Sequence, residues 1–145
     1  RDTDRSRGLG DVYKRQGFSM GNHRLVVMDV FDYFKYAKKK GLSYDLIVID
    51  PPSFARNKKR TFSANKDYHK LIAQSLDILS EHGTIIASTN AANMTVQQFK
   101  KQLRKGLGDV SADFVNLQQL PADFTVNPND PTSNYLKVYT IKVNK

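Results

Sequence analysis

Residues 44–54 place a carboxylate, two prolines and an aromatic ring directly after an apolar run. The residues from Leu46 to Ile49 are all apolar, which is typical of a parallel strand that is covered on both faces. Asp50 would then lie at the carboxyl end of a strand, the edge at which open α/β sheets bind their ligands. Pro51 and Pro52 have no backbone N–H to continue the strand, so the chain must leave the sheet there.

The side chains at this strand end could hold a flat, polar ligand. The Asp50 carboxylate accepts hydrogen bonds from an amine, and Phe54 offers a ring for stacking. This pairing suits a nucleobase. An ordinary strand followed by a proline turn would show the same residues, and local chemistry alone leaves both interpretations open.

A family resemblance favours the first interpretation. The segment Asp50-Pro51-Pro52-Ser53-Phe54 resembles the motif after the fourth strand of class I S-adenosylmethionine (SAM) dependent methyltransferases that act on nucleic-acid bases. Residues 28–32 and the basic run 55–63 are similar to the class I enzymes that modify large-subunit ribosomal RNA. The similarity runs from about Gly17 to the C-terminus, and it implies SAM as cofactor and ribosomal RNA as partner.

By this resemblance, Asp50, Pro51, Pro52 and Phe54 match the catalytic motif. The expected reaction is direct attack of a base nitrogen on the SAM methyl group, with Asp50 orienting the base and positioning supplying most of the rate. Relatives that methylate carbon-5 of cytosine carry a cysteine after the fifth strand, whereas residues 87–93 and the whole chain have none. The residues present therefore cannot form a thiolate adduct with that carbon.

The resemblance assigns cofactor binding to Asp29, Val30 and Asp50. The Asp29 carboxylate would accept from the adenine amino group, and the Val30 backbone N–H would face the ring. Asp29 is also a good N-cap for a helix that begins at Phe31, and the two roles are compatible.

The glycine-rich turn and the ribose-binding acid of the family are not visible. Gly8-Leu9-Gly10 follows no strand, and a glycine turn needs that context. Residues 11–16 match the translation of a sequencing-library adaptor, so we interpret residues 1–16 as a disordered, non-native scar; a natural basic arm is the alternative. Residues 17–145 are then a partial methyltransferase domain that lacks its first two strands.

The chain has 23 basic and 14 acidic side chains and a net charge of +9, which favours a polyanionic partner. Helix C-termini attract cations, and this explains the basic clusters at 35–40 and 100–105. It does not explain the cluster that follows the Asp50 motif. The four predicted RNA-binding residues are Arg56, Lys58, Lys59 and Arg60.

The hydrophobic pattern predicts alternating strands and helices. Strands are expected at 24–29, 44–50, 84–89, 114–120 and 135–143. Helices are expected at 31–40, from about Asn65 to Leu79, and from Thr95 to Gly106 or Gly108. A long loop should join residues 51–65. This order predicts a Rossmann-like α/β sheet of parallel strands, with an antiparallel last strand because no helix precedes it.

Other classes of function receive less support. No apolar stretch approaches the roughly 20 residues that span a membrane, and His23, His69 and His82 lack metal-ligand spacing. We therefore expect no membrane partner and no metal, and a cytoplasmic location because no secretory signal is visible. A non-catalytic RNA-binding module and another nucleotide-using α/β enzyme, such as an oxidoreductase, stay open.

The missing glycine turn generates a prediction about the cofactor. Residues 1–145 alone should bind SAM much more weakly than a homologue that has the turn, because the backbone cradle for the cofactor is absent. Calorimetric titration measures this directly. Micromolar or tighter binding to residues 1–145 would contradict the expectation.

Overall fold

The computed structural model describes residues 24, 26–57 and 60–145. The chain divides into two units, residues 1–33 and 34–145. The predicted scar at residues 1–16 lies outside the described residues and stays a prediction. None of the helices in the described ranges has the length and apolar character to span a bilayer, and that part of the chain brings no three His, Asp or Glu side chains together at a potential metal site.

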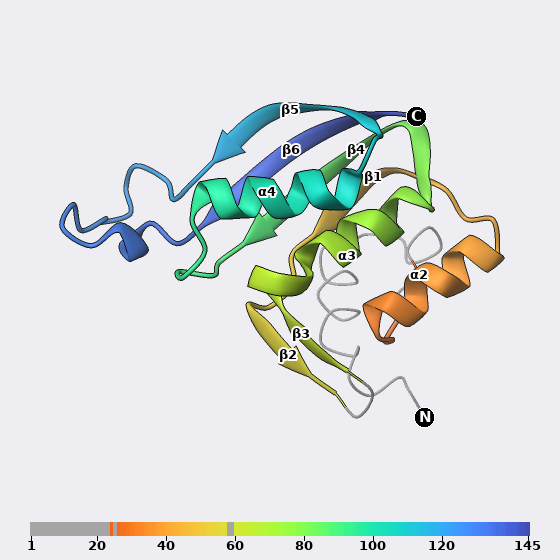
Figure 1. Cartoon of the computed structure of the whole chain (residues 1–145), viewed down its shortest axis with the longest axis horizontal. Coiled ribbons are helices and arrows are strands. Elements are labelled where there is room, and N and C mark those ends of the chain that lie inside the picture. The colour runs from red at the N-terminus through yellow and green to blue at the C-terminus, as the bar shows by residue number, and fades with distance from the viewer. Residues whose placement is uncertain (1–23, 25, 58–59) are drawn as a thin grey trace, which may run out of the picture. The chain divides into compact units, whose positions relative to one another are not determined.

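Four strands form the main sheet, in the order β1 (Tyr44–Ile49), β4 (Leu79–Thr89), β6 (Lys137–Asn144) and β5 (Ser111–Gln118). β1 is parallel to β4, and β6 is antiparallel to both of its neighbours (Figure 1). The predicted mixed α/β sheet with an antiparallel last strand is therefore confirmed.

Helices α3 (Ala64–Leu76) and α4 (Val96–Leu107) cover one face of this sheet (Figure 1). Between them and the sheet lie the largest fully buried side chains, which include Tyr68, Phe99, Ile85 and Ile141. Three rings run through this core: Phe99 is 4.9 Å from Tyr68 and 5.9 Å from Tyr139, measured between centroids. The core thus joins both helices to the central strands.

Two helix ends follow their sequence signals. Helix α2 (Val30–Lys39) is followed within two residues by Gly41, which has φ +64°, a left-handed conformation that glycine adopts without a steric penalty. Helix α4 begins with a capping box, in which the Thr95 N–H donates to Gln98 Oε1 at 2.8 Å and the Gln98 N–H donates to Thr95 Oγ1 at 3.1 Å. Both predicted ends are confirmed.

The strand predicted at 24–29 is not formed by the described residues. Val26, Val27 and Met28 are 39%, 63% and 50% exposed and belong to no strand. An isolated apolar run becomes a strand only when a neighbour pairs with its backbone, and none of the strand pairs in the described ranges includes this run. The expected double coverage of β1 is also wrong for these residues, because Leu46 and Val48 are 53% and 62% exposed.

The segment expected as a loop contains a hairpin. Strands β2 (Phe54–Arg56) and β3 (Thr61–Ser63) pair antiparallel. Helix α3 then begins directly after Ser63, so the expectation of Asn65 as N-cap is wrong: the Ser63 N–H donates to the Asp67 carboxylate at 3.0 Å instead. The helix ends at Leu76, three residues earlier than predicted, because β4 already begins at Leu79.

Helices α3 and α4 approach closely at Gly106. A Cβ placed there would lie 2.6 Å from the His69 carbonyl oxygen and 2.6 Å from Ile72 Cβ. Gln102, one turn earlier, donates to the Asn65 carbonyl at 2.9 Å. The absence of a side chain at Gly106 therefore permits the contact that holds the two helices over the sheet.

Gly106→Ala should lower the free energy of unfolding by about 1–3 kcal/mol, because overpacking separates the two helices. This loss would outweigh the gain of about 1 kcal/mol that alanine gives in an exposed helix. Urea unfolding measures the change. Lys101→Ala, an exposed change in the same helix, is the control and should stay within about 0.5 kcal/mol. A more stable Gly106→Ala variant would show that the helices are not in contact there.

Candidate active site

Asp50 and Ser88 meet at the carboxyl edge of the sheet. Because β1 and β4 are parallel and Ile49 pairs with Ala87, the residues that follow each partner emerge side by side. The Ser88 hydroxyl donates a hydrogen bond to Asp50 Oδ1. Asp50 is exposed, whereas Ser88 is 8% exposed. The carboxylate is thus held at one oxygen and presented to solvent at the position that the sequence predicts.

Tyr68 joins the two strand ends from below this carboxylate. Its hydroxyl lies 3.0 Å from the Ile49 carbonyl oxygen and 2.7 Å from the Ser88 carbonyl oxygen. Tyr68 is fully buried, with its ring edge-on to Phe99. Burial raises the pKa of the Tyr68 hydroxyl, and the negative charge of Asp50 raises it further. The hydroxyl therefore stays protonated and remains a donor to the strand ends.

Sequence reasoning missed both Tyr68 and Ser88. The helical spacing of Tyr68 with Leu71 indicates a core position, and a core position it is. One signal was available, because a buried tyrosine needs a partner for its hydroxyl. That signal does not identify the partner, which lies 19 and 20 residues away along the chain.

The turn after Asp50 is tied to the loop after β4. The Ser53 hydroxyl donates to Asn90 Oδ1 at 2.8 Å, and the Ser53 carbonyl accepts from the Ala64 N–H at 3.0 Å. Pro51 and Pro52 fix φ between these contacts and Asp50. The predicted catalytic segment is thereby anchored to three elements: β1, the β4 loop and the start of α3.

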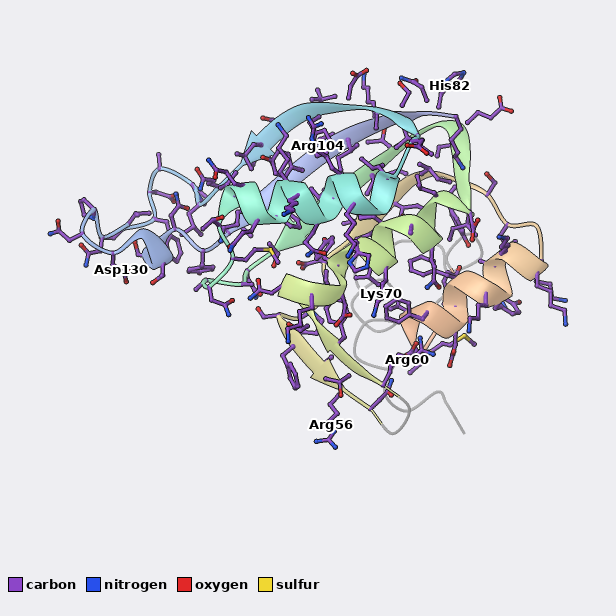
Figure 2. The ribbon with its side chains drawn as sticks, viewed as in Figure 1. Arg56, Arg60, Lys70, His82, Arg104 and Asp130 are labelled. Carbon is purple, nitrogen blue, oxygen red and sulfur yellow. The ribbon has the colours of Figure 1, made fainter. Side chains whose placement is uncertain are left out.

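The hairpin carries the predicted aromatic and basic residues away from this turn. Phe54 is 62% exposed and pairs with Ser63. Arg56 is exposed and projects from the hairpin in Figure 2. The Arg60 N–H donates to Asn57 Oδ1 at 2.8 Å and closes the turn. Lys58 and Lys59 lie outside the described residues, so their predicted RNA contact is untested.

The other two basic clusters make contacts within the fold. Lys38 forms an ion pair with Asp77 at 2.9 Å. Lys100 and Arg104 of α4 lie 5.2 and 5.5 Å from the ring centre of Phe114 on β5, a cation–π arrangement; Figure 2 labels Arg104. These contacts agree with a structural explanation of both clusters, and the RNA contact predicted for the hairpin stays a prediction.

Asp29 caps helix α2. Its Oδ1 accepts from the Phe31 N–H at 3.0 Å and from the Asp32 N–H at 3.4 Å. Val30, the first residue of the helix, is 43% exposed. The capping role is therefore confirmed, and the cofactor role of Asp29 and Val30 stays a prediction.

A family model for S-adenosylmethionine-dependent methyltransferases matches residues 3–138. The Bacillus subtilis protein YwbD, whose name assigns it to the ribosomal RNA large subunit methyltransferases, is 43% identical over 83% of this chain. Ribosomal RNA large subunit methyltransferase K of Neisseria meningitidis is 30% identical over 77% of the chain. These matches cover 31% and 30% of the two relatives, so the chain spans about a third of their length.

Two solved structures of proteins described as methyltransferases also resemble this chain. SMU.776, a protein described as a methyltransferase and crystallised with SAH, superposes with a TM-score of 0.91 at 64% identity. The match covers 97% of this chain and 37% of that protein. A Streptococcus mutans structure described as a SAM-dependent methyltransferase superposes with a TM-score of 0.87 at 60% identity.

Tyr68→Phe should lower the free energy of unfolding by about 1–3 kcal/mol, because two buried carbonyls lose their shared donor while the ring still packs. Urea unfolding measures the loss. Tyr135→Phe is the matched control, since within the described residues no hydrogen bond of its hydroxyl is found, and it should change little. Equal stability of the Tyr68→Phe variant and the wild type would mean that the hydroxyl does not hold the strand ends.

Proposed function

We propose that this chain, which belongs to the S-adenosylmethionine-dependent methyltransferase family, forms the base-binding part of an enzyme that methylates large-subunit ribosomal RNA. One observation carries the proposal: an exposed carboxylate, Asp50, is fixed at the joint end of two parallel strands, four residues before the exposed ring of Phe54. The names of the relatives support ribosomal RNA as substrate. A cytoplasmic location follows from that substrate.

The residues present fit the adenine part of the family's cofactor. When bound, SAM supplies a methyl group on a sulfonium, which is a good leaving group. The capping bonds to Asp29 Oδ1 are compatible with recognition of an adenine amino group, because each carboxylate oxygen can accept more than one hydrogen bond. Asp29 and Val30 would hold the adenine, and the family resemblance assigns a cofactor contact to Asp50 as well.

Asp50 orients the target base. A carboxylate accepts hydrogen bonds and cannot donate them, so it selects a base edge that carries an N–H group. Phe54 supplies a stacking surface, and stacking on an aromatic ring tolerates any base. The Ser88 hydroxyl, the Tyr68 bridge and the two prolines limit the movement of Asp50. Holding the nucleophilic nitrogen in line supplies much of the rate, and the nitrogen can release its proton to the exposed carboxylate.

The hairpin holds the RNA backbone. Arg56 and Arg60 flank its turn, and the sequence places Lys58 and Lys59 between them. Cations at this position neutralise phosphates and release counterions, so they add affinity that depends on salt. In this proposal Asp50 and Phe54 select the base, and the neighbouring basic residues of the hairpin bind the RNA backbone.

Asp50→Ala, in an intact protein that carries this sequence, should reduce single-turnover methylation by about 100-fold or more while RNA affinity is nearly unchanged, because the carboxylate orients a base and neutralises no phosphate. The double change Lys58→Ala and Lys59→Ala should weaken RNA binding and reduce its log–log salt slope by about one to two.

Asp45→Ala is the control for charge, because Asp45 is an exposed carboxylate at the opposite end of β1. It should leave methylation and binding as in the wild type. Wild-type turnover of Asp50→Ala at saturating RNA would refute the role of Asp50. If the lysine variant loses turnover while its RNA binding is unchanged, the hairpin contributes to catalysis and not to RNA binding.

A further inference from the structure

A cavity of about 490 Å³ lies beside the Asp50 edge, within the unit formed by residues 34–145. Its walls come from the loop after β4, the first residues of α4 and the long connection between β5 and β6, which extends past the strand ends on the left of Figure 1. Ala92, Met94 and Val96 provide an apolar side, and Thr132 and Asn134 provide polar groups. Its volume and mixed lining suit a small ligand with a flat apolar face and polar edges.

Lys137 also lines this cavity and is 4% exposed. Its Nζ donates to the Ala91 carbonyl at 3.1 Å and to the Tyr135 carbonyl at 2.8 Å. An ammonium group has three donors, and within the described residues neither a third acceptor nor a carboxylate is found for it. Burial lowers the pKa of Lys137. A buried cation without a counter-charge is costly, so an anion in the cavity would be stabilised.

The cavity and the Asp50 turn share one loop. Lys137 pairs in register with Thr89, the last residue of β4. Asn90, the next residue, accepts the hydrogen bond from Ser53 in the Asp50 turn, and the Ala91 carbonyl accepts from Lys137. A ligand in the cavity would therefore touch the same loop that is hydrogen-bonded, through Asn90 and Ser53, to the turn that carries Asp50.

We propose that this cavity binds one nucleotide of the RNA substrate adjacent to the methylated one, with its phosphate beside Lys137 and its base against Ala92, Met94 and Val96. The inference rests on the proposed function and adds a specificity site to it. A free phosphate would satisfy the ammonium but leave the apolar side exposed to water, so the lining favours a nucleotide. The site would make methylation depend on the neighbour of the target base.

Lys137→Met keeps the length of the side chain and removes its charge. In the intact protein it should weaken binding of a large-subunit ribosomal RNA fragment about tenfold at low salt and reduce the salt slope by about 0.7, the value for one phosphate contact on a single strand. Lys142→Met is the matched control, because Lys142 is exposed on the same strand, and it should match the wild type. An unchanged salt slope in Lys137→Met would overturn the phosphate contact and leave Lys137 a purely structural residue.

Ala92→Trp tests the site without altering Lys137 or its two acceptors, and it serves if Lys137→Met does not fold. Ala92 is an exposed residue of the cavity lining, so the indole should fill the cavity. RNA affinity and its salt slope should then fall as they do in Lys137→Met. Wild-type RNA binding by Ala92→Trp would overturn the site.

Titration with uridine 5′-monophosphate, uridine and inorganic phosphate identifies the ligand. The nucleotide should bind best, and equal binding of inorganic phosphate would overturn the nucleotide assignment. These measurements follow binding and not methyl transfer. Absence of RNA methylation with a Lys137-dependent salt slope would therefore refute the proposed function alone, and normal methylation with an unchanged slope would refute this site alone.

Discussion

The hydroxyl of Tyr68 is the contact on which the candidate site depends. It lies between the last carbonyl of β1 and the carbonyl of Ser88 on β4, so it sets how far apart the two strands end. The Ser88 hydroxyl can reach Asp50 only while that spacing is kept. The ring of Tyr68 in turn rests on Phe99 of α4, and α4 lies against α3 through Gly106. The packing of α3 against α4 therefore helps to set the position of the Asp50 carboxylate.

Much of the fold could be predicted because its signals are local. Gly41 ends α2 and the Thr95–Gln98 box begins α4 through bonds within four residues. The strand expected at 24–29 was wrong for the opposite reason, since a strand needs a partner and an apolar run does not contain one. The β2–β3 hairpin was missed because its strands have three residues each, too few for an alternating pattern to show.

The candidate site was predictable in the same uneven way. The position of Asp50 at a strand end could be predicted from the apolar run before it and the two prolines after it. Its partner Ser88 lies 38 residues away and carries no sequence signal of its own. Lys137 did leave a signal. Period-two alternation places it on the same face as Tyr139, Ile141 and Val143, all of which are buried. A lysine on an apolar face indicates a buried charge that needs a partner, and only the structure shows the cavity beside it.

The central claim is that a base nitrogen, oriented by Asp50, receives the methyl group. The most direct test incubates the intact protein with large-subunit ribosomal RNA and isotope-labelled SAM, digests the RNA to nucleosides, and locates the label by mass spectrometry. A single labelled nucleoside with the methyl group on a base nitrogen is the predicted result. Label on the ribose hydroxyl or on carbon-5 of a pyrimidine would contradict the claim, because neither position presents an N–H to the carboxylate.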